Sequence, residues 1–372
     1  ADQNETCSKF ANMFKDQYEQ YVAKQHKPGI LIAGASGTGK STLCNLMLGR
    51  EFASVGTGRP VTRGINCYTD DKVTIFDSEG YEPGSATESE YLKLISDFVS
   101  AREHEEVPVD VIWYAISAPG ARVTDLDASL IKTLKNDLHK PVAAVLTQVD
   151  VATLEQCDAL REALLKTAGL EELAVFESTH AADIAIARAR SLDALFDWTV
   201  AHLEQSRRDS FIAACHQRGF DLKEKEASTI IKEHVGLAVA ACATPVPFSD
   251  ALLLSPIQLA MLARIAFVWD LTGIKELAGG LLVNSIMPTL GRSIAGNLLK
   301  LIPGIGTLAG TVINGGVAAA LTTALGTVFN KTCRKIAEGK LTGRAQDLSD
   351  LFDSDFVKNV IELFKLHNRK NS

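Results

Sequence analysis

The segment Gly34-Ala-Ser-Gly-Thr-Gly-Lys40-Ser41 has the strongest chemical signature in the chain, and it is the only match to the pattern GxxxxGK[ST]. It follows the apolar run GILIAGA and precedes the helical stretch STLCNLMLG. The glycines let successive N–H groups face a phosphate, the Lys40 ammonium adds a cation, and the Ser41 hydroxyl can ligate Mg²⁺. The following helix directs its positive end at the same anion. We expect phosphate contacts from Gly34, Ser36, Gly37, Thr38, Gly39, Lys40, Ser41 and Thr42.

A second motif could complete this phosphate site. Asp77-Ser-Glu-Gly80 ends the apolar run KVTIF and fits the pattern DxxG. In that pattern the aspartate holds Mg²⁺ through water and the glycine N–H reaches the terminal phosphate. Because the motif stands at the end of a predicted strand behind the phosphate loop, we expect Asp77 and Gly80 to serve the same site.

A mobile hydroxyl is the third expected part of the metal site. The segment RPVTRG lies between the two motifs and makes Thr62 the best-placed hydroxyl to close over Mg²⁺ and the γ-phosphate, with Thr57 and Thr69 as competitors. The expected catalytic groups are Lys40, Thr62 and Gly80. The expected metal ligands are Ser41, Thr62 and Asp77.

Thr147-Gln148-Val149-Asp150 follows the apolar run PVAAVL and is the candidate for base recognition. A carboxylate only accepts hydrogen bonds, so Asp150 could accept both N1–H and N2–H₂ of guanine, which adenine does not offer. If Asp150 is a bystander, the same phosphate loop would suit an ATPase, and that alternative stays open.

Composition and charge narrow the classes of protein to which the chain can belong. The chain has 372 residues and a formal net charge of −7, which favours two domains and argues against a general nucleic-acid binder. Its seven cysteines have no CxxC spacing and its eight histidines no HxxxH or HExxH spacing, so we expect neither disulfides nor a metal site beyond Mg²⁺. The polar start and free thiols predict a cytoplasmic protein.

The hydrophobic pattern divides the chain into unlike parts. Residues 1–27 carry an amphipathic helix, and residues 28–206 alternate short apolar strands with amphipathic helices, which predicts an α/β domain with a mainly parallel sheet flanked by helices. After residue 206 the strand signal stops, and residues 231–331 contain only ten charges. Residues 207–372 are therefore expected to form an all-α hydrophobic helical domain.

The ordered motifs resemble those of the translation-factor-related P-loop GTPases, especially the Era-like and dynamin-like branch, over roughly residues 28–206. The resemblance implies a P-loop GTPase fold and a slow Mg²⁺-dependent hydrolysis of GTP to GDP and phosphate. It also implies that Ser178-Thr179 presents a backbone N–H to the guanine O6, as the SA[KL] motif of the family does. The second half is similar to a Gly/Ala-rich helical domain of unknown function appended to some bacterial Era-like GTPases.

Three positions depart from the family pattern. Gln148 replaces the lysine whose stem lies along the guanine ring, and Tyr81 follows DxxG where Ras-type enzymes have a water-orienting glutamine. Gly37 replaces the asparagine of potassium-activated relatives, so potassium dependence is not expected. The attacking water would need another group, a partner or a second copy of the chain, and Arg59 and Arg63 beside Thr62 are candidates. A nucleotide-gated scaffold with negligible hydrolysis is the alternative that these departures leave open.

Residues 301–330 contain no charged side chain. If helical, 30 residues would exceed the thickness of a bilayer, but Pro303, Asn314 and six glycines lower the hydropathy of the run. Three interpretations stay open for this segment: a helix buried in a helical domain, peripheral contact with a membrane, and an integral segment. The expected partners are guanine nucleotide, further copies of the chain in a homodimer or larger assembly, and a membrane surface.

Overall fold

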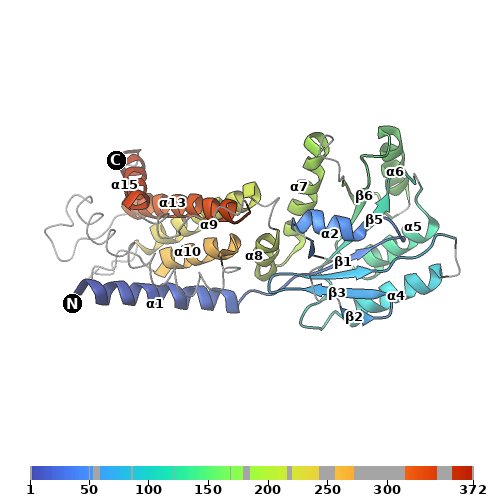
Figure 1. Cartoon of the computed structure of the whole chain (residues 1–372), viewed down its shortest axis with the longest axis horizontal. Helices are drawn as coiled ribbons and strands as arrows, with labels where there is room; N and C mark the ends of the chain where they lie inside the picture. Colours follow the sequence, from blue (N-terminus) through green and yellow to red (C-terminus); the bar gives the residue numbers. More distant parts are fainter. Residues whose placement is uncertain are drawn as a thin grey trace. The chain divides into compact units, whose positions relative to one another are not determined.

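The computed structural model describes residues 2–49, 51–52, 59–84, 87–120, 122–167, 169–178, 185–215, 220–242, 256–271, 315–341 and 354–370. The chain forms two compact units (Figure 1). One is an α/β unit, His26–Gly219, and the other is a helical unit that combines Ala1–Gln25 with Phe220–Ser372. The predicted fold class is confirmed: a mainly parallel sheet flanked by helices is followed by a helical region.

A seven-stranded sheet in the order β2-β3-β4-β1-β5-β6-β7 forms the centre of the α/β unit. Strand β1 pairs in parallel with both β4 and β5, and β5-β6-β7 continue in parallel. The β2-β3 and β3-β4 pairs are antiparallel. The strands are β1 (Gly29–Ala33), β2 (Arg59–Thr62), β3 (Ile65–Thr69), β4 (Thr74–Ser78), β5 (Val111–Ser117), β6 (Val142–Thr147) and β7 (Ala174–Glu177).

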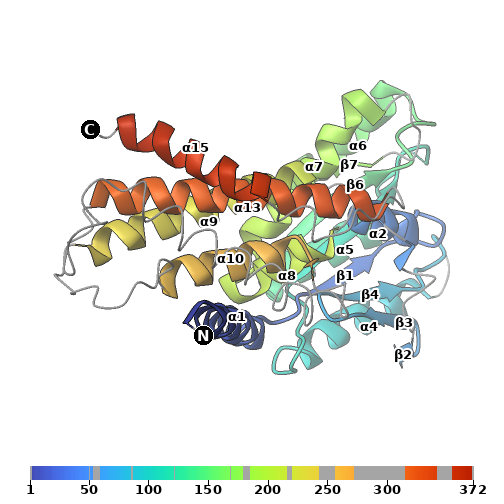
Figure 2. The same ribbon diagram turned by 60° about the vertical axis from the view of Figure 1, so that its left-hand side comes forward.

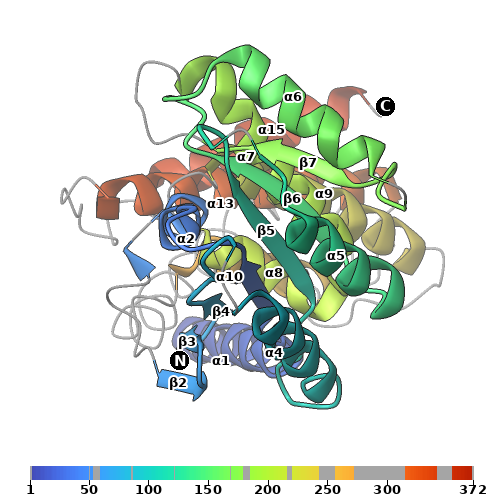
Figure 3. The same cartoon turned by 90° about the vertical axis from the view of Figure 1, so that its right-hand side faces the viewer.

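Helices cover both faces of this sheet (Figure 3). Two of them, α5 and α6, begin with a capping box in which a threonine side chain and the side chain three residues later each accept an amide hydrogen bond. The described helices of this unit are α2 (Lys40–Leu48), α4 (Glu88–Ala101), α5 (Asp125–Lys132) with the π-helix Thr133–Asp137, α6 (Leu154–Lys166), α7 (Ala185–His202) and α8 (Gln205–Ala214).

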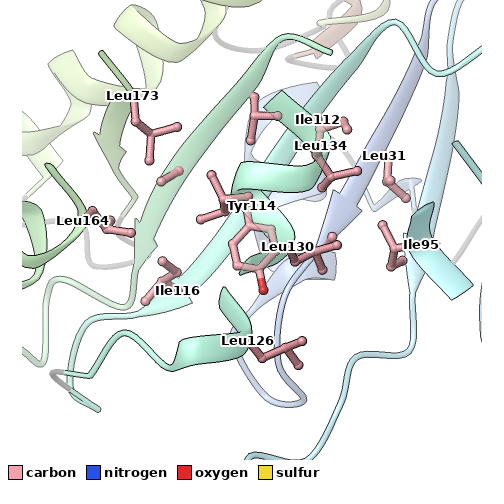
Figure 4. Close-up of a cluster of buried hydrophobic side chains, with 14 of the residues drawn as sticks. Leu31, Ile95, Ile112, Tyr114, Ile116, Leu126, Leu130, Leu134, Leu164 and Leu173 are labelled. Carbon is pink, nitrogen blue, oxygen red and sulfur yellow. The ribbon is translucent and has the colours of Figure 1, made fainter. Parts of the chain in front are cut away.

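Strand β5 shows why the sheet is buried on both faces. Tyr114 projects among the leucines of α5 (Figure 4). Successive side chains of a strand point to opposite sides, so its neighbour Trp113 faces the other way. The Trp113 indole donates to Thr199 Oγ1 of α7 at 3.1 Å and packs edge-on against Phe211 of α8. Burying such a side chain contributes roughly 1.5–3 kcal/mol, and both faces of β5 therefore stabilise the unit.

The helical unit is built on α9, which packs against α10 and α13 (Figure 2). Helix α13 also contacts α15, and α10 contacts the N-terminal helix α1, where Tyr21 packs edge-on against Phe267. Gly326 allows α13 to approach α9, because a Cβ there would lie 2.7 Å from Ile231 Cγ1. The described helices of this unit are α1 (Asp2–Ala23), α9 (Phe220–Ala241), α10 (Pro256–Val268), α13 (Gly315–Leu341) and α15 (Ser354–Lys370).

Only part of the charge-free segment 301–330 falls within the described residues. Residues 315–330 lie in α13, whereas residues 301–314 lie outside the described part of the chain. None of the helices in the described ranges is long and apolar enough to cross a membrane.

Candidate nucleotide-binding site

The topology of the sheet brings the predicted motifs to one edge. The order in which the strands are added reverses at β1. Its neighbour on one side is β4, and its neighbour on the other side is β5. In open α/β sheets the crevice outside the carboxyl ends of strands at such a reversal is where ligands bind. The motifs follow the carboxyl ends of β1, β4 and β6, and Ser178 follows β7. The motifs therefore lie together at the carboxyl ends of the parallel strands.

The loop after β1 has the curled backbone that a phosphate cradle requires. Gly34 has a φ of 139°, and a Cβ there would lie 2.3 Å from the carbonyl oxygen of Ala115. Gly39 is left-handed with a φ of 79° and immediately precedes α2. Because an L side chain is strained in these conformations, glycine is required at both positions. Thr38 Oγ1 donates to the Ala35 carbonyl at 2.9 Å and closes the loop.

Lys40 begins α2 and turns its side chain back under the loop. Its ammonium donates to the carbonyl oxygens of Gly34 at 3.2 Å and Ala35 at 2.8 Å, and the residue is only 7% exposed. Burial lowers the pKa of this ammonium, and the nearby Asp77 carboxylate partly opposes that effect. A partly desolvated cation beside the amino end of a helix is the arrangement that binds phosphate.

Ser41 and Asp77 fit a divalent cation. Ser41 Oγ donates to Asp77 Oδ2 at 3.0 Å. Asp77 Oδ1 is buried, and no hydrogen-bond partner for it exists among the residues that the structure describes. Burial also raises the pKa of Asp77, which indicates a carboxylate short of compensating positive charge. A hydroxyl beside an unsatisfied carboxylate oxygen is a donor set that suits Mg²⁺.

The three candidate hydroxyls for the mobile loop fall in different places. Thr62 lies in β2 with its side chain exposed, and its closure over the metal stays a prediction. Thr57 lies outside the described residues. Thr69 pairs with Thr74 at the start of β4, with 2.9 Å between their hydroxyls, whereas Asp77 lies toward the other end of that strand. Thr69 is therefore badly placed for the metal.

The base-recognition loop is tied to the phosphate loop by two side chains. Thr147 Oγ1 donates to the Thr38 carbonyl at 2.5 Å, and Gln148 Nε2 donates to the Gly37 carbonyl at 3.2 Å. Gln148 Oε1 accepts from Ser117 Oγ at 3.2 Å. Gln148 has a φ of 56°, a conformation uncommon outside glycine, and these bonds hold it there. The uncharged amide of Gln148 therefore links the base-recognition loop to the phosphate loop.

Ser178 lies beside the loop 147–150 because β6 and β7, which end at these two places, are neighbours in the sheet. Its N–H donates to the Leu146 carbonyl at 2.7 Å, and its own carbonyl accepts from Val149 N–H at 3.3 Å. Asp150 is half-buried in the adjacent turn. Thr179 lies outside the described residues, and Thr42 is exposed in the first turn of α2. The contacts of Ser178 and Asp150 with a base stay predictions.

Sequence reasoning missed two side chains behind the loops. Tyr91 of α4 accepts from Gly34 N–H at 2.9 Å, and its hydroxyl lies 2.8 Å from Ser78 Oγ. Asp127 of α5 accepts from the hydroxyl of Tyr81 at 2.6 Å. Tyr91 occupies a buried position in an amphipathic helix, and Asp127 is the third residue of one, so their patterns indicated only core packing and helix capping.

We expect Gln148→Lys to raise the affinity for GDP about fivefold. The ammonium can reach the same Gly37 carbonyl and adds a cation near the nucleotide, and a charged hydrogen bond contributes about 1 kcal/mol more than a neutral one. Fluorescence titration with a labelled GDP measures the change. Gln148→Ala, which loses the bond to Gly37, should bind more weakly than the parent chain. An unchanged or lower affinity for Gln148→Lys would exclude this role.

The chain is similar to several known proteins. The family model described as "50S ribosome-binding GTPase" matches residues 29–148. Magnetosome membrane protein 22 of Magnetospirillum gryphiswaldense is 34% identical over 113 residues, which cover 28% of this chain and 56% of that protein, so the chain spans about half the length of this relative. A crystal structure of Era in complex with MgGDPNP and 16S ribosomal RNA nucleotides is similar at 22% identity, with a TM-score of 0.33, over 49% of this chain and 58% of that chain.

A further relative, most of whose length this chain covers, shows to which family the chain belongs. The probable GTP-binding protein EngB of Wolbachia pipientis subsp. Culex pipiens is 30% identical over 156 residues, which cover 40% of this chain and 76% of the relative. The range matched by the family model, residues 29–148, includes both the GxxxxGK[ST] loop and the DxxG motif. The chain therefore belongs to the translation-factor-related P-loop GTPases, the family of GTP-hydrolysing proteins that includes EngB.

Proposed function

We propose that the site described above binds guanine nucleotide and hydrolyses GTP to GDP and phosphate, and that the bound nucleotide controls the helical unit. The proposal rests above all on the contact between the two loops. Thr147 and Gln148 hold the base-recognition loop against the carbonyls of Thr38 and Gly37, so a nucleotide could span both loops at once.

The phosphates would be held by the curled loop. The N–H groups from Gly37 to Ser41 would bind the β-phosphate, and the Lys40 ammonium would leave its two carbonyl partners to neutralise the β- and γ-phosphates. Ser41, Asp77 and, after loop closure, Thr62 would hold Mg²⁺, which neutralises charge that develops between the β- and γ-oxygens. The Gly80 N–H would orient the γ-phosphate, so that positioning and charge supply most of the catalysis.

The base would be read at the adjacent end of the site. Asp150 would accept from N1–H and N2–H₂ of guanine. Of the Ser178-Thr179 pair, the backbone N–H of Thr179 would donate to O6, because that of Ser178 is bonded to the Leu146 carbonyl. Gln148 would support one side of the ring without the cation that a lysine brings. Adenine has no N–H donor at either of these two positions, so an adenine nucleotide should bind much more weakly.

Competition binding tests this function directly. A labelled GDP bound to the full chain in the presence of Mg²⁺ is displaced with unlabelled GTP, GDP and ATP. The proposal expects displacement by both guanine nucleotides and a far weaker effect of ATP. Equal displacement by ATP would mean that Asp150 does not select the base, and the ATPase alternative would replace the present one.

We expect slow turnover by the isolated chain, on the order of 10⁻³ to 10⁻² per second, rising when copies gather. The Tyr81 hydroxyl donates to Asp127 and is not free to orient water, so a second group must complete the site. Arg63 is exposed at the β2-β3 turn and could approach the γ-phosphate of a facing copy. The measurement is specific activity over a hundredfold range of protein concentration, with and without liposomes.

Arg63→Ala provides the control for this expectation. It should leave the activity at low concentration unchanged and remove the rise. A flat profile of the parent chain in every condition would contradict assembly-driven activation. With such a flat profile, we would infer a switch that another protein activates.

A further inference from the structure

The hydroxyl of Tyr91 lies between the two strand ends that carry the proposed phosphate and magnesium site. It accepts from the N–H of Gly34, the first residue after β1, at 2.9 Å. It also lies 2.8 Å from Oγ of Ser78, the last residue of β4. Strands β1 and β4 are parallel neighbours, so this one hydroxyl joins them at their carboxyl ends. We call the two contacts together the Tyr91 bridge.

The bridge is buried, and the hydroxyl can make all of its contacts at once. Tyr91 is only 4% exposed, so water does not replace a lost contact. Burial raises the pKa of Tyr91 to about 12, and the phenol therefore keeps its proton at neutral pH. A phenol hydroxyl both donates and accepts. When Ser78 donates to it, its own proton is left for the Gly34 carbonyl oxygen at 3.3 Å.

On the side of β1, the bridge fixes the start of the phosphate loop. A Cβ at Gly34 would lie 2.3 Å from the carbonyl oxygen of Ala115 in β5, so the Gly34 backbone is confined between this strand and the Tyr91 hydroxyl. The Gly34 carbonyl accepts from the Lys40 ammonium at 3.2 Å. A displacement of Gly34 would therefore shift the loop that leads to Lys40 and Ser41.

On the side of β4, the bridge fixes the residue directly after Asp77. Ser41 Oγ and Asp77 Oδ2 are 3.0 Å apart and come from the two chain segments that Tyr91 joins. Mg²⁺ requires near-ideal octahedral geometry with oxygen ligands at about 2.0–2.1 Å, so even a small shift of one segment against the other weakens its binding. The bridge lies where such a shift would begin.

We propose that Tyr91 is a positioning residue for magnesium, whose hydroxyl holds the start of the phosphate loop and the end of β4 in the relative position that lets Ser41 and Asp77 serve one ion. This inference rests on the proposed function of the site. Tyr91 acts through these two residues and not by contact with the ion. Replacement of a residue that orients metal ligands typically lowers metal affinity by about 10- to 100-fold.

Tyr91→Phe tests this role, because it removes the hydroxyl and keeps the ring that packs against Tyr81. We expect the Mg²⁺ concentration that half-saturates the GDP complex to rise about tenfold, and the affinity for GDP in EDTA to change less than about threefold. Both are measured on the full chain with a fluorescent GDP, by titration with Mg²⁺ and with the nucleotide. An unchanged Mg²⁺ requirement, or an equal loss of GDP affinity with Mg²⁺ and with EDTA, would overturn the inference.

Tyr114→Phe is the matched control. Tyr114 lies opposite Ala33 in the β1-β5 pair and is fully buried, but its hydroxyl donates to Asp127 at 2.8 Å. We expect both variants to lower the thermal midpoint of unfolding, and only Tyr91→Phe to raise the Mg²⁺ requirement. Equal rises in the two variants would assign the effect to general loosening of the core and reject the inference.

Ser78→Ala breaks the bridge at its other end and leaves Gly34 bonded to Tyr91. We expect a rise in the Mg²⁺ requirement similar to that of Tyr91→Phe, with a smaller loss of thermal stability because no buried N–H group loses its partner. The bridge can be broken only once, so the double variant should stay within about twofold of Tyr91→Phe. Effects that multiply in the double variant would mean that the two residues act independently, and would overturn the bridge.

The parent chain separates failure of this inference from failure of the proposed function. If the parent chain binds no guanine nucleotide, the proposed function fails and the role of Tyr91 fails with it. If the parent chain binds GDP without any dependence on Mg²⁺, the magnesium site at Ser41 and Asp77 is rejected, and the inference is rejected too. A parent chain that depends on Mg²⁺, with Tyr91→Phe behaving as the parent does, rejects the role of Tyr91 alone.

Discussion

Lys40→Ala is expected to lower the affinity for GTP by at least about 100-fold without unfolding the chain. The substitution removes the ammonium that lies under the curled loop, and each charged hydrogen bond to a phosphate contributes about 1.5–3 kcal/mol. Burial lowers the pKa of Lys40, so the folded nucleotide-free protein keeps this cation at a cost in stability. The thermal midpoint of the variant should therefore be unchanged or higher.

Lys72→Ala is the matched control for this prediction. Lys72 is another largely buried lysine, 5% exposed, but it lies in the β3-β4 turn and pairs with Asp71. Its removal should leave nucleotide affinity unchanged, whatever it does to stability. Calorimetric titration of both variants with a GTP analogue compares them. Undiminished binding by Lys40→Ala would reject the phosphate-loop assignment.

Asp150→Asn should shift the preference of the site from guanine toward xanthine nucleotides. The amide replaces one acceptor by a donor, which mismatches the guanine N2–H₂ group and matches the carbonyl that xanthine carries there. A mispaired polar group costs about 1–3 kcal/mol, or roughly five- to 150-fold in affinity. Displacement of a labelled nucleotide by GTP and by XTP measures the ratio of the two affinities.

Asp158→Asn, on the exposed face of α6, controls for the loss of a negative charge near this loop. It should leave the ratio of GTP to XTP affinity as it is in the parent chain. If Asp150→Asn behaves in the same way as this control, Asp150 does not read the base.

The curled backbone of the proposed phosphate loop could be predicted from the sequence because its glycines are required by local backbone geometry. Gly34 and Gly39 are required by left-handed conformations within one short loop, and Lys40 and Ser41 open the helix that follows it. The strands could be predicted for a similar reason, since short apolar runs such as Val111–Ser117 are buried on both faces. In these cases neighbours in sequence are also neighbours in space.

The features that sequence reasoning missed depend on residues far apart in the chain. Tyr91 bonds to Gly34 across 57 residues, and Tyr81 to Asp127 across 46. A tyrosine on the apolar side of a helix and an acid in its first turn have the same local pattern whether or not they serve a site. The partner of the N-terminal helix α1 is likewise a distant one, α10. Such pairings follow only from the folded sheet and helices.

Single-turnover hydrolysis of GTP and ATP, measured side by side on the full chain with Mg²⁺, is the most direct test of the proposed GTPase reaction. We expect that bound GTP is converted to GDP and phosphate, that ATP is not hydrolysed at a comparable rate, and that Lys40→Ala releases no phosphate. Equal hydrolysis of ATP would contradict base selection by Asp150. Tight binding of GTP without any phosphate release over many hours would contradict the GTPase reaction and favour a nucleotide-gated scaffold.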